Sequence, residues 1–427
     1  MAITAASVSK RWQPWQALIA CLLWCWAGLA LAHPMPETRV WIDTTPAGMN
    51  LTLQLPLNRL EFAFGQPLSE QPAQVLPRYA DALSAYLLQH VGARSDGIGW
   101  QVLRPTLKVV GNDSSAELEA VFELHAPTDA DVRSPTLLYD VINHEVRTHR
   151  ALVFLRNDWH GGYAGQPPLL LGELRYGQNT LPITLQAAPA FASVRALLWG
   201  GAEHIAEGTD HLLFLLMLLL VAPLAAQGKR WSTLRPLKPA LRHTALVITC
   251  FTIGHTITLV LGSTGLLVVP SQPVEVAVAV TIAIAALHAW RPLFANAEAW
   301  MALAFGLIHG MAFSASLSGA GLTIAQHAQA LLAFNIGIEL AQLAGLLIVL
   351  PPLLMLGHLR GELYGWLRRL LSVAAAVLAL AWVSARAGLG EFEALSWLDE
   401  AGAVALIVPG IFWLLALLCY GQRRLAI

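Results

Sequence analysis

Charged residues are scarce in this sequence. They make up 12% of its 427 residues, while 56% are hydrophobic; an ordinary soluble protein carries about a quarter charged residues. This deficit indicates that a lipid bilayer surrounds much of the chain. The formal net charge is −1, and the basic residues lie in short loops, so we expect no nucleic-acid partner.

Cysteine is also scarce, with four residues in the whole chain. Cys21 and Cys25 lie near the amino terminus, and Cys250 and Cys419 lie in separate apolar segments. Residues 33–190 contain none. That region must therefore fold without disulfide bonds.

The amino terminus has the pattern of an export signal. Lys10 and Arg11 precede an apolar run that closes on the small residues Ala30 and Ala32, which is typical of a signal peptidase site. We expect residues 1–32 to be a cleaved signal peptide. An uncleaved anchor is the alternative, but the apolar run is shorter than a spanning helix needs.

Residues 33–190 alternate between polar and apolar side chains, as half-buried strands do. The clearest stretches are 38–43, 50–55 and 116–124. One helix is predicted near residues 77–91, where Tyr79, Leu83 and Leu87 recur at helical spacing. We predict a soluble, mainly-β, sandwich-like domain over 33–190.

Residues 191–427 are predicted to form an α-helical transmembrane domain. Most of its apolar segments are long enough for a bilayer core about 30 Å thick. We expect seven spans, near residues 204–224, 244–263, 274–290, 301–320, 330–356, 370–388 and 401–420.

Basic residues predict the orientation of these spans. They gather in the segment between the first two spans, between the fifth and sixth, and at the end of the chain: Lys229, Arg230, Arg235, Lys238, Arg242, Arg360, Arg368, Arg369, Arg423 and Arg424. Such segments are cytoplasmic by the positive-inside rule. With the export signal, this predicts a bacterial inner-membrane protein with a periplasmic amino-terminal domain and a cytoplasmic carboxyl terminus.

A few ionisable and polar residues interrupt the apolar segments, where an unpaired charge costs at least a few kcal/mol. The candidate metal ligands are His204, Asp210, His211, His255, His309, Asn335 and Glu339. A single histidine of this kind can be a hydrogen-bonded core residue, but several histidines and carboxylates at similar depths favour a metal. Imidazole and carboxylate ligands suit Ni²⁺, Co²⁺ or Zn²⁺, and the sequence has no cysteine or methionine cluster for Cu⁺.

Counting residues along each span divides these ligands into two predicted groups. The outer group is His204, Asp210 and His211, whose spacing places both imidazoles on one helix face. The inner group is His255, His309 and Glu339, at similar depths for a rise of about 1.5 Å per residue. Asn335, one helical turn outward from Glu339, is predicted to supply an oxygen between them; a hydrogen-bonded core that fixes helix register is the alternative for the inner group.

These residues lie in four stretches that resemble the HupE/UreJ family of bacterial membrane proteins, in the branch with an export signal and an extracytoplasmic domain. The stretches are His204-x5-Asp210-His211, 251–259, 305–313 and 334–343. The mature start at 32–34 and residues 138–145 are also similar to that branch. The His-x5-Asp-His pattern is similar to the signature of nickel permeases that serve hydrogenase and urease maturation. The second half of the permease pattern, Phe-His-Gly, is present here only as Ile308-His309-Gly310.

The resemblance implies a permease or accessory protein for a divalent transition metal, with nickel first and cobalt or zinc next. Its expected partners are the bilayer, the metal ion and hydrogenase or urease maturation proteins. Two alternatives remain open from the residues. One is an intramembrane zinc hydrolase, since histidine and aspartate can hold Zn²⁺ with an open position for water. The other is a non-transporting metal-binding accessory protein or sensor.

Overall fold

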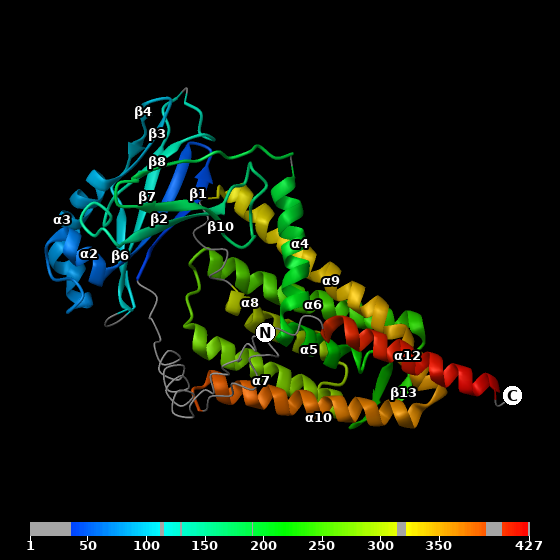
Figure 1. Ribbon diagram of the computed structural model, residues 1–427. Coiled ribbons are helices and arrows are strands. Elements are labelled where there is room, and N and C mark those ends of the chain that lie inside the picture. Colours follow the sequence, from blue (N-terminus) through cyan, green and yellow to red (C-terminus); the bar gives the residue numbers. More distant parts are fainter. Residues whose placement is uncertain are drawn as a thin grey trace, which may run out of the picture.

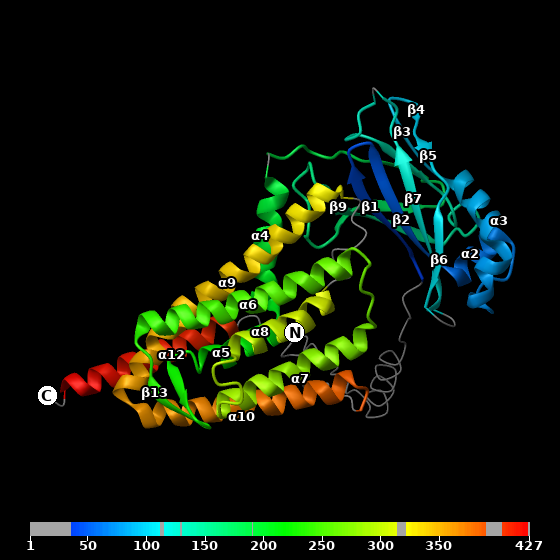
Figure 2. The ribbon, with the colours of Figure 1, turned by 180° about the vertical axis from the view of Figure 1, so that it is seen from behind.

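The computed structural model describes residues 36–111, 115–128, 130–189, 191–313, 322–389 and 404–425. A β-rich part precedes a bundle of helices, and the two lie side by side in both views (Figures 1 and 2). The predicted signal peptide, residues 1–32, lies outside the described residues.

A seven-stranded sheet forms most of the β-rich part, in the order β10-β9-β1-β2-β7-β5, with β6 also paired to β7. Its strands are β1 (Thr38–Thr45), β2 (Gly48–Pro56), β5 (Gln101–Val102), β6 (Thr106–Val110), β7 (Glu117–His125), β9 (Arg150–Asn157) and β10 (Leu169–Arg175). β1 and β9 run parallel, and the other neighbours are antiparallel. In β7, Leu118, Ala120, Phe122 and Leu124 are all buried, as the alternating sequence predicts.

A smaller sheet and two helices share the core of the large sheet. The sheet has the order β11-β8-β3-β4, and the elements are α2 (Leu57–Phe64), the 3₁₀ turn η1 (Pro72–Gln74), α3 (Val75–His90), β3 (Val91–Ser95), β4 (Ile98–Gly99), β8 (Thr136–Tyr139) and β11 (Thr180–Pro182). Leu83 of α3, Ala93 of β3, Tyr139 of β8 and Leu53 of β2 belong to one buried apolar cluster. The predicted mainly-β, sandwich-like domain and its one long helix are therefore confirmed.

The helical part contains eight described helices, two of which are short and meet end to end. They are α4 (Ala192–Glu207), α5 (Thr209–Leu219), α6 (Leu237–Ser263), α7 (Ser271–Trp290), α8 (Glu298–Phe313), α9 (Ile324–Leu359), α10 (Gly361–Arg386) and α12 (Val404–Leu425). The basic segment between the first two predicted spans contains a hairpin of β12 (Leu224–Gln227) and β13 (Arg230–Leu234). The chain thus has the predicted fold class, a β-rich domain followed by membrane helices.

Four of the described helices are long and apolar enough to cross a membrane, namely α6, α7, α9 and α10. They coincide with the second, third, fifth and sixth predicted spans. α5 and α8 are apolar but shorter, and predicted residues 314–320 and 401–403 lie outside the described part. Seven spans therefore remain a prediction, as does the domain division at residue 190.

Glycines set the distance between the helices that carry the candidate ligands. A Cβ on Gly306 of α8 would lie 2.0 Å from the carbonyl oxygen of Phe251 in α6, and one on Gly254 of α6 would lie 2.2 Å from that of Leu303. α4 and α9 approach in the same way at Gly201 and Gly337. These contacts are backbone against backbone, so a larger residue cannot be accommodated by a side-chain rotation.

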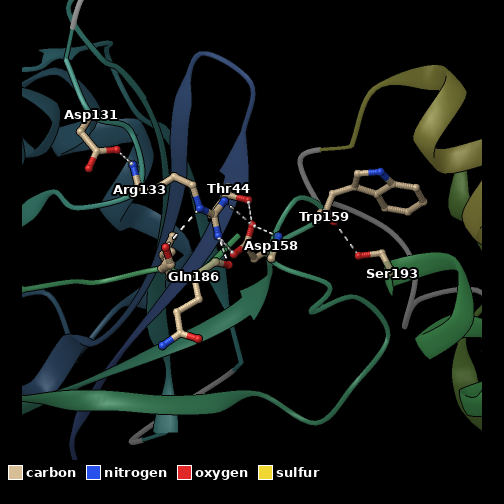
Figure 3. A network of polar contacts seen from close by, with 9 residues as sticks. Thr44, Asp131, Arg133, Asp158, Trp159, Gln186 and Ser193 are labelled. Carbon is tan, nitrogen blue, oxygen red and sulfur yellow. Dashed lines mark hydrogen bonds and ion pairs between the residues drawn. The ribbon is translucent and has the colours of Figure 1, made fainter. Parts of the chain in front are cut away.

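An ion pair and its neighbours tie the β-rich part to the first helix. Asp158 accepts hydrogen bonds from Thr44 Oγ1 at 3.0 Å and from Arg133 at 2.7 and 3.2 Å. The next residue, Trp159, accepts a hydrogen bond through its carbonyl oxygen from Ser193 Oγ of α4 at 2.7 Å. Figure 3 shows this row of contacts running from the sheet to α4. The loop after β9 is thus held against the amino-terminal end of α4.

Gly306→Ala should destabilise the bundle, because the new methyl group must separate α6 from α8. Overpacking of this kind costs about 1–3 kcal/mol, and we expect a lower thermal unfolding midpoint for the purified protein. Gly365→Ala is the matched control, because a Cβ at Gly365 of α10 meets nothing within 4 Å. Equal midpoints for the two variants would show that the α6–α8 contact is not tight.

His149 makes the β-rich domain sensitive to acid. Its imidazole is buried, its Nε2 lies 2.8 Å from Thr38 Oγ1, and burial, followed by the charge of Arg59, lowers its pKa to about 4. Below pH 6.5 this imidazole becomes protonated in the unfolded chain but stays largely neutral in the folded chain down to about pH 4. The free energy of unfolding therefore falls, by roughly 2 kcal/mol at pH 5.

This fall should appear as a lower thermal midpoint at pH 5 than at pH 7.5, measured by tryptophan fluorescence. His149→Gln, which does not titrate, should show a smaller difference between the two pH values. His125→Gln, at an exposed imidazole, should behave as the parent does. An unchanged pH difference in His149→Gln would rule out this role.

Candidate metal centre

The first candidate ligands lie on either side of a helix break. α4 ends at Glu207 and α5 begins at Thr209, with Gly208 between them in an extended conformation. A Cβ at Gly208 would lie 2.8 Å from Nδ1 of His211, so the absence of a side chain leaves room for this imidazole. α4 begins at Ala192, well before the predicted start of the first span at residue 204. The prediction missed these residues because Arg195 and Glu203 interrupt the apolar pattern, although they do not end the helix.

Three imidazoles meet at this break. His204 of α4, His211 of α5 and His255 of α6 each offer a ligand atom within 4.8 Å of the others. The ring centroids of His204 and His211 are 4.6 Å apart, and those of His204 and His255 are 6.2 Å apart. His211 and His255 are buried, and His204 is partly buried.

Asn335 of α9 determines which nitrogen of His255 is free. The Asn335 amide donates to the Leu331 carbonyl oxygen at 2.8 Å, so its Oδ1 is the atom that faces His255 Nδ1 at 3.2 Å. That oxygen can only accept a hydrogen bond, and the proton of the neutral imidazole therefore lies on Nδ1. Nε2 keeps its lone pair and points into the site.

His309 of α8 is oriented by the same kind of contact. Its Nε2 lies 2.9 Å from Thr281 Oγ1 of α7, and that hydroxyl donates its own proton to the Val278 carbonyl oxygen. The His309 proton must therefore lie on Nε2, which leaves a lone pair on Nδ1. The His309 ring lies 5.2 Å from that of His211, so it borders the three-histidine group.

Asp210 places a negative charge beside the histidines. Its Oδ1 lies 3.2 Å from His211 Nδ1 and accepts a hydrogen bond from the His211 amide at 3.0 Å. Its Oδ2 lies 3.9 Å from Arg386 Nη2, at the end of α10. A carboxylate against Nδ1 favours the tautomer in which His211 Nε2 is free, as in many metal-bound histidines.

Within this site, five buried ring nitrogens have no hydrogen-bond partner among the described residues: His204 Nε2, His211 Nδ1, His211 Nε2, His255 Nε2 and His309 Nδ1. A buried polar atom left unpaired costs about 1–3 kcal/mol. Several of them in one place are therefore expensive unless something binds there. Imidazole nitrogens beside a carboxylate fit a borderline divalent metal ion.

The structure groups the predicted ligands differently from the sequence. His255, expected in an inner group, lies with His204 and His211, and Asn335 contacts His255 directly. Glu339 instead accepts a hydrogen bond from Thr249 Oγ1 at 2.6 Å. The prediction of two separate groups is wrong, because α4 begins outside the predicted first span and brings His204 to the depth of His255.

A water-accessible cavity opens onto His204. It has a volume of about 460 Å³ and lies between the loop after β9 and the helices α4 and α9. Glu203, His204 and Glu207 line it from α4, and Arg156 lines it from the β-rich domain. Phe334, which also lines it, packs 5.5 Å from the His204 ring. We call this cavity the vestibule.

A family model described as HupE / UreJ protein matches residues 182–386, which include the vestibule side of α4 and every residue of the histidine site. This part of the chain belongs to the HupE/UreJ family. Membership suggests a transition-metal transport or accessory role, with nickel or cobalt. Searches of curated proteins and of solved structures give no match for the chain.

Two features of the HupE/UreJ domain were missed from the sequence. Thr281 orients His309 from a different helix, and Arg386 reaches Asp210 from the far end of the domain. Threonine is common in membrane helices, and Arg386 looks like an ordinary helix-end residue. These contacts depend on how α7 and α10 are rotated about their own axes, and the sequence pattern does not show that rotation.

Replacing His204, His211 or His255 with alanine should each weaken Ni²⁺ binding to the purified protein by an order of magnitude or more, because each removes one of the grouped nitrogens. The measurement is competition with a chelator of known affinity. His358→Ala, at an exposed position near the carboxyl-terminal end of α9, is the control. Parent-like affinity in both His204→Ala and His211→Ala would exclude this site.

Proposed function

We propose that this protein is a membrane permease for a divalent transition metal ion, with nickel as the first candidate cargo and cobalt or zinc as the alternatives. The ion would enter from the side of the β-rich domain, which we place in the periplasm of a bacterium. The carboxyl terminus and the basic segments would face the cytoplasm. Hydrogenase or urease maturation proteins are the proposed consumers of the ion.

One observation carries this proposal, the group of buried ring nitrogens with free lone pairs at His204, His211 and His255. A hydrogen-bonded core that only fixes helix register would pair these atoms with one another or with the backbone. Here Nδ1 of His255 pairs with Asn335 and Nδ1 of His211 lies 3.2 Å from Asp210 Oδ1, while neither Nε2 atom has a hydrogen-bond partner among the described residues. That arrangement suits a cation and leaves a register role unsupported.

The vestibule supports entry from the side of the β-rich domain. The Glu203 and Glu207 side chains are exposed on α4 next to His204. Carboxylates at the mouth of a cavity raise the local concentration of cations. The ion would lose its water in steps, first against these carboxylates and then against the imidazoles.

A row of polar side chains continues from the site toward the predicted cytoplasmic side, between α6 and α9. Thr252 Oγ1 lies 3.4 Å from Gln342 Oε1, and Thr249 Oγ1 donates a hydrogen bond to Glu339 Oε1. Both pairs lie inward of the contact between His255 and Asn335, given the predicted orientation. A hydrolase needs a water-filled reaction site but no such onward row, so these pairs favour transport.

Cells that express the parent protein should accumulate ⁶³Ni²⁺ above cells without it. His211→Ala should abolish the increase, since it removes a central ligand. Glu339→Gln should lower uptake at least several-fold at matched protein levels, because it removes the one carboxylate of the inward row while keeping its size and hydrogen bond to Thr249. His358→Ala should transport as the parent does.

Three outcomes would separate the candidate functions. Ni²⁺ binding without any uptake would identify a non-transporting accessory protein or sensor. Normal uptake by Glu339→Gln would exclude the inward row as the route. Uptake of Co²⁺ or Zn²⁺ in preference to Ni²⁺ would change the assigned cargo ion but would not affect the proposed transport route.

A further inference from the structure

A second group of histidines lies in the β-rich domain, outside the residues matched by the family model. His90 is the last residue of α3, and Asp140 and His144 follow β8 in a turn. One ligand atom from each lies within 4.8 Å of the others. Figures 1 and 2 place α3 on the side of the β-rich domain away from α4, so this group is separate from the vestibule.

The backbone brings these residues together. The Asp140 amide donates to the His90 carbonyl oxygen at 3.1 Å, and the His144 amide donates to the Asp140 carbonyl oxygen at 3.2 Å. Val141 and Ile142, between them, are fully buried in the domain core, which anchors the turn. The imidazoles of His90 and His144 then stack, with ring centroids 4.3 Å apart and planes 15° from parallel.

Asp140 fixes the proton of both imidazoles. His90 Nδ1 lies 2.7 Å from Asp140 Oδ1, and His144 Nδ1 lies 2.7 Å from the Asp140 carbonyl oxygen. Carboxylate and carbonyl oxygens accept hydrogen bonds, so each neutral ring carries its proton on Nδ1. Both Nε2 atoms keep a lone pair, and both lie on the ring edges turned away from Asp140.

We propose that His90 and His144 bind a divalent transition metal ion through Nε2, with Asp140 as the residue that orients both rings. A histidine that donates Nδ1–H to a carboxylate or carbonyl oxygen while ligating through Nε2 is the usual arrangement at metal sites. Metal–nitrogen bonds of about 2.0–2.1 Å place two ligands up to about 4.2 Å apart across an ion. One ligand atom of each residue lies within 4.8 Å of the others, and a rotation of the two imidazoles that turns both Nε2 lone pairs toward one ion would complete the site.

The surroundings suit a cation that exchanges with solvent. The His90 side chain is 19% exposed and that of Asp140 is 32% exposed, so an ion reaches the site directly from water. Glu145, next to His144, is exposed and adds a second carboxylate. Two imidazoles beside carboxylates select the same borderline ions as the bundle site, Ni²⁺, Co²⁺ or Zn²⁺.

Residue-specific footprinting tests this site on the unaltered full chain. Diethyl pyrocarbonate modifies accessible imidazole nitrogens, and mass spectrometry reports each histidine separately. Ni²⁺ should reduce the modification of His90 and His144 at least fivefold and leave the exposed His125 unchanged. Equal modification of His90 and His144 with and without Ni²⁺ would overturn the proposal.

Variants separate this site from the one in the bundle. The double variant His204→Ala/His211→Ala should still bind Ni²⁺ at a remaining site, and adding His90→Ala with His144→Ala should reduce that binding at least tenfold. Adding His125→Ala with His160→Ala instead, at two exposed imidazoles, should change nothing. Loss of footprint protection with intact ⁶³Ni²⁺ uptake would reject this site alone, whereas protection without uptake would reject only the permease.

Discussion

The approach of helix backbones at a few glycines is the constraint on which the histidine site depends. α6 meets α8 at Gly254 and Gly306, and α4 meets α9 at Gly201 and Gly337, where any Cβ would lie about 2 Å from a carbonyl oxygen of the facing helix. At separations set by larger side chains, His204 would not reach His255. The glycines therefore act on the site through distance alone, since they offer no ligand.

The orientation of the imidazoles in this site is set by neighbouring polar side chains. Asn335 and Thr281 each pair with one nitrogen of a neighbouring histidine, and Asp210 lies 3.2 Å from Nδ1 of His211. Unpaired buried nitrogens are unfavourable, and a bound cation would relieve that cost. Under the proposed function, part of the affinity would come from this relief, and release inward would need polar partners such as Gln342 and Glu339.

The sequence predicted the residue types of the site well and their grouping less well. The spacing of His204 and His211 predicted one face of a continuous helix, on which the two rings would be about two turns apart; the helix instead breaks at Gly208, and the ring centroids lie 4.6 Å apart. The depth of His255 relative to His204 was misjudged. Arg195 and Glu203 interrupt the apolar run, so the first turns of α4 were not predicted as part of the first span. Contacts such as that of Thr249 with Glu339 depend on how α6 and α9 are rotated about their axes, which hydropathy does not encode. The β-rich domain was predicted from strict alternation, but the meeting of His90 with His144 requires the long-range placement of α3 beside the turn after β8.

The break at Gly208 also has a mechanical meaning. α4 is fastened to the β-rich domain through Ser193 and to α9 through Gly201, whereas α5 packs into the main apolar cluster of the bundle through Phe214 and Leu218. His204 belongs to the first of these bodies and His211 to the second, with one extended residue as the joint. A ligand that bonds both imidazoles would link α4 to α5 across that joint, so its binding would stiffen the connection between these two helices.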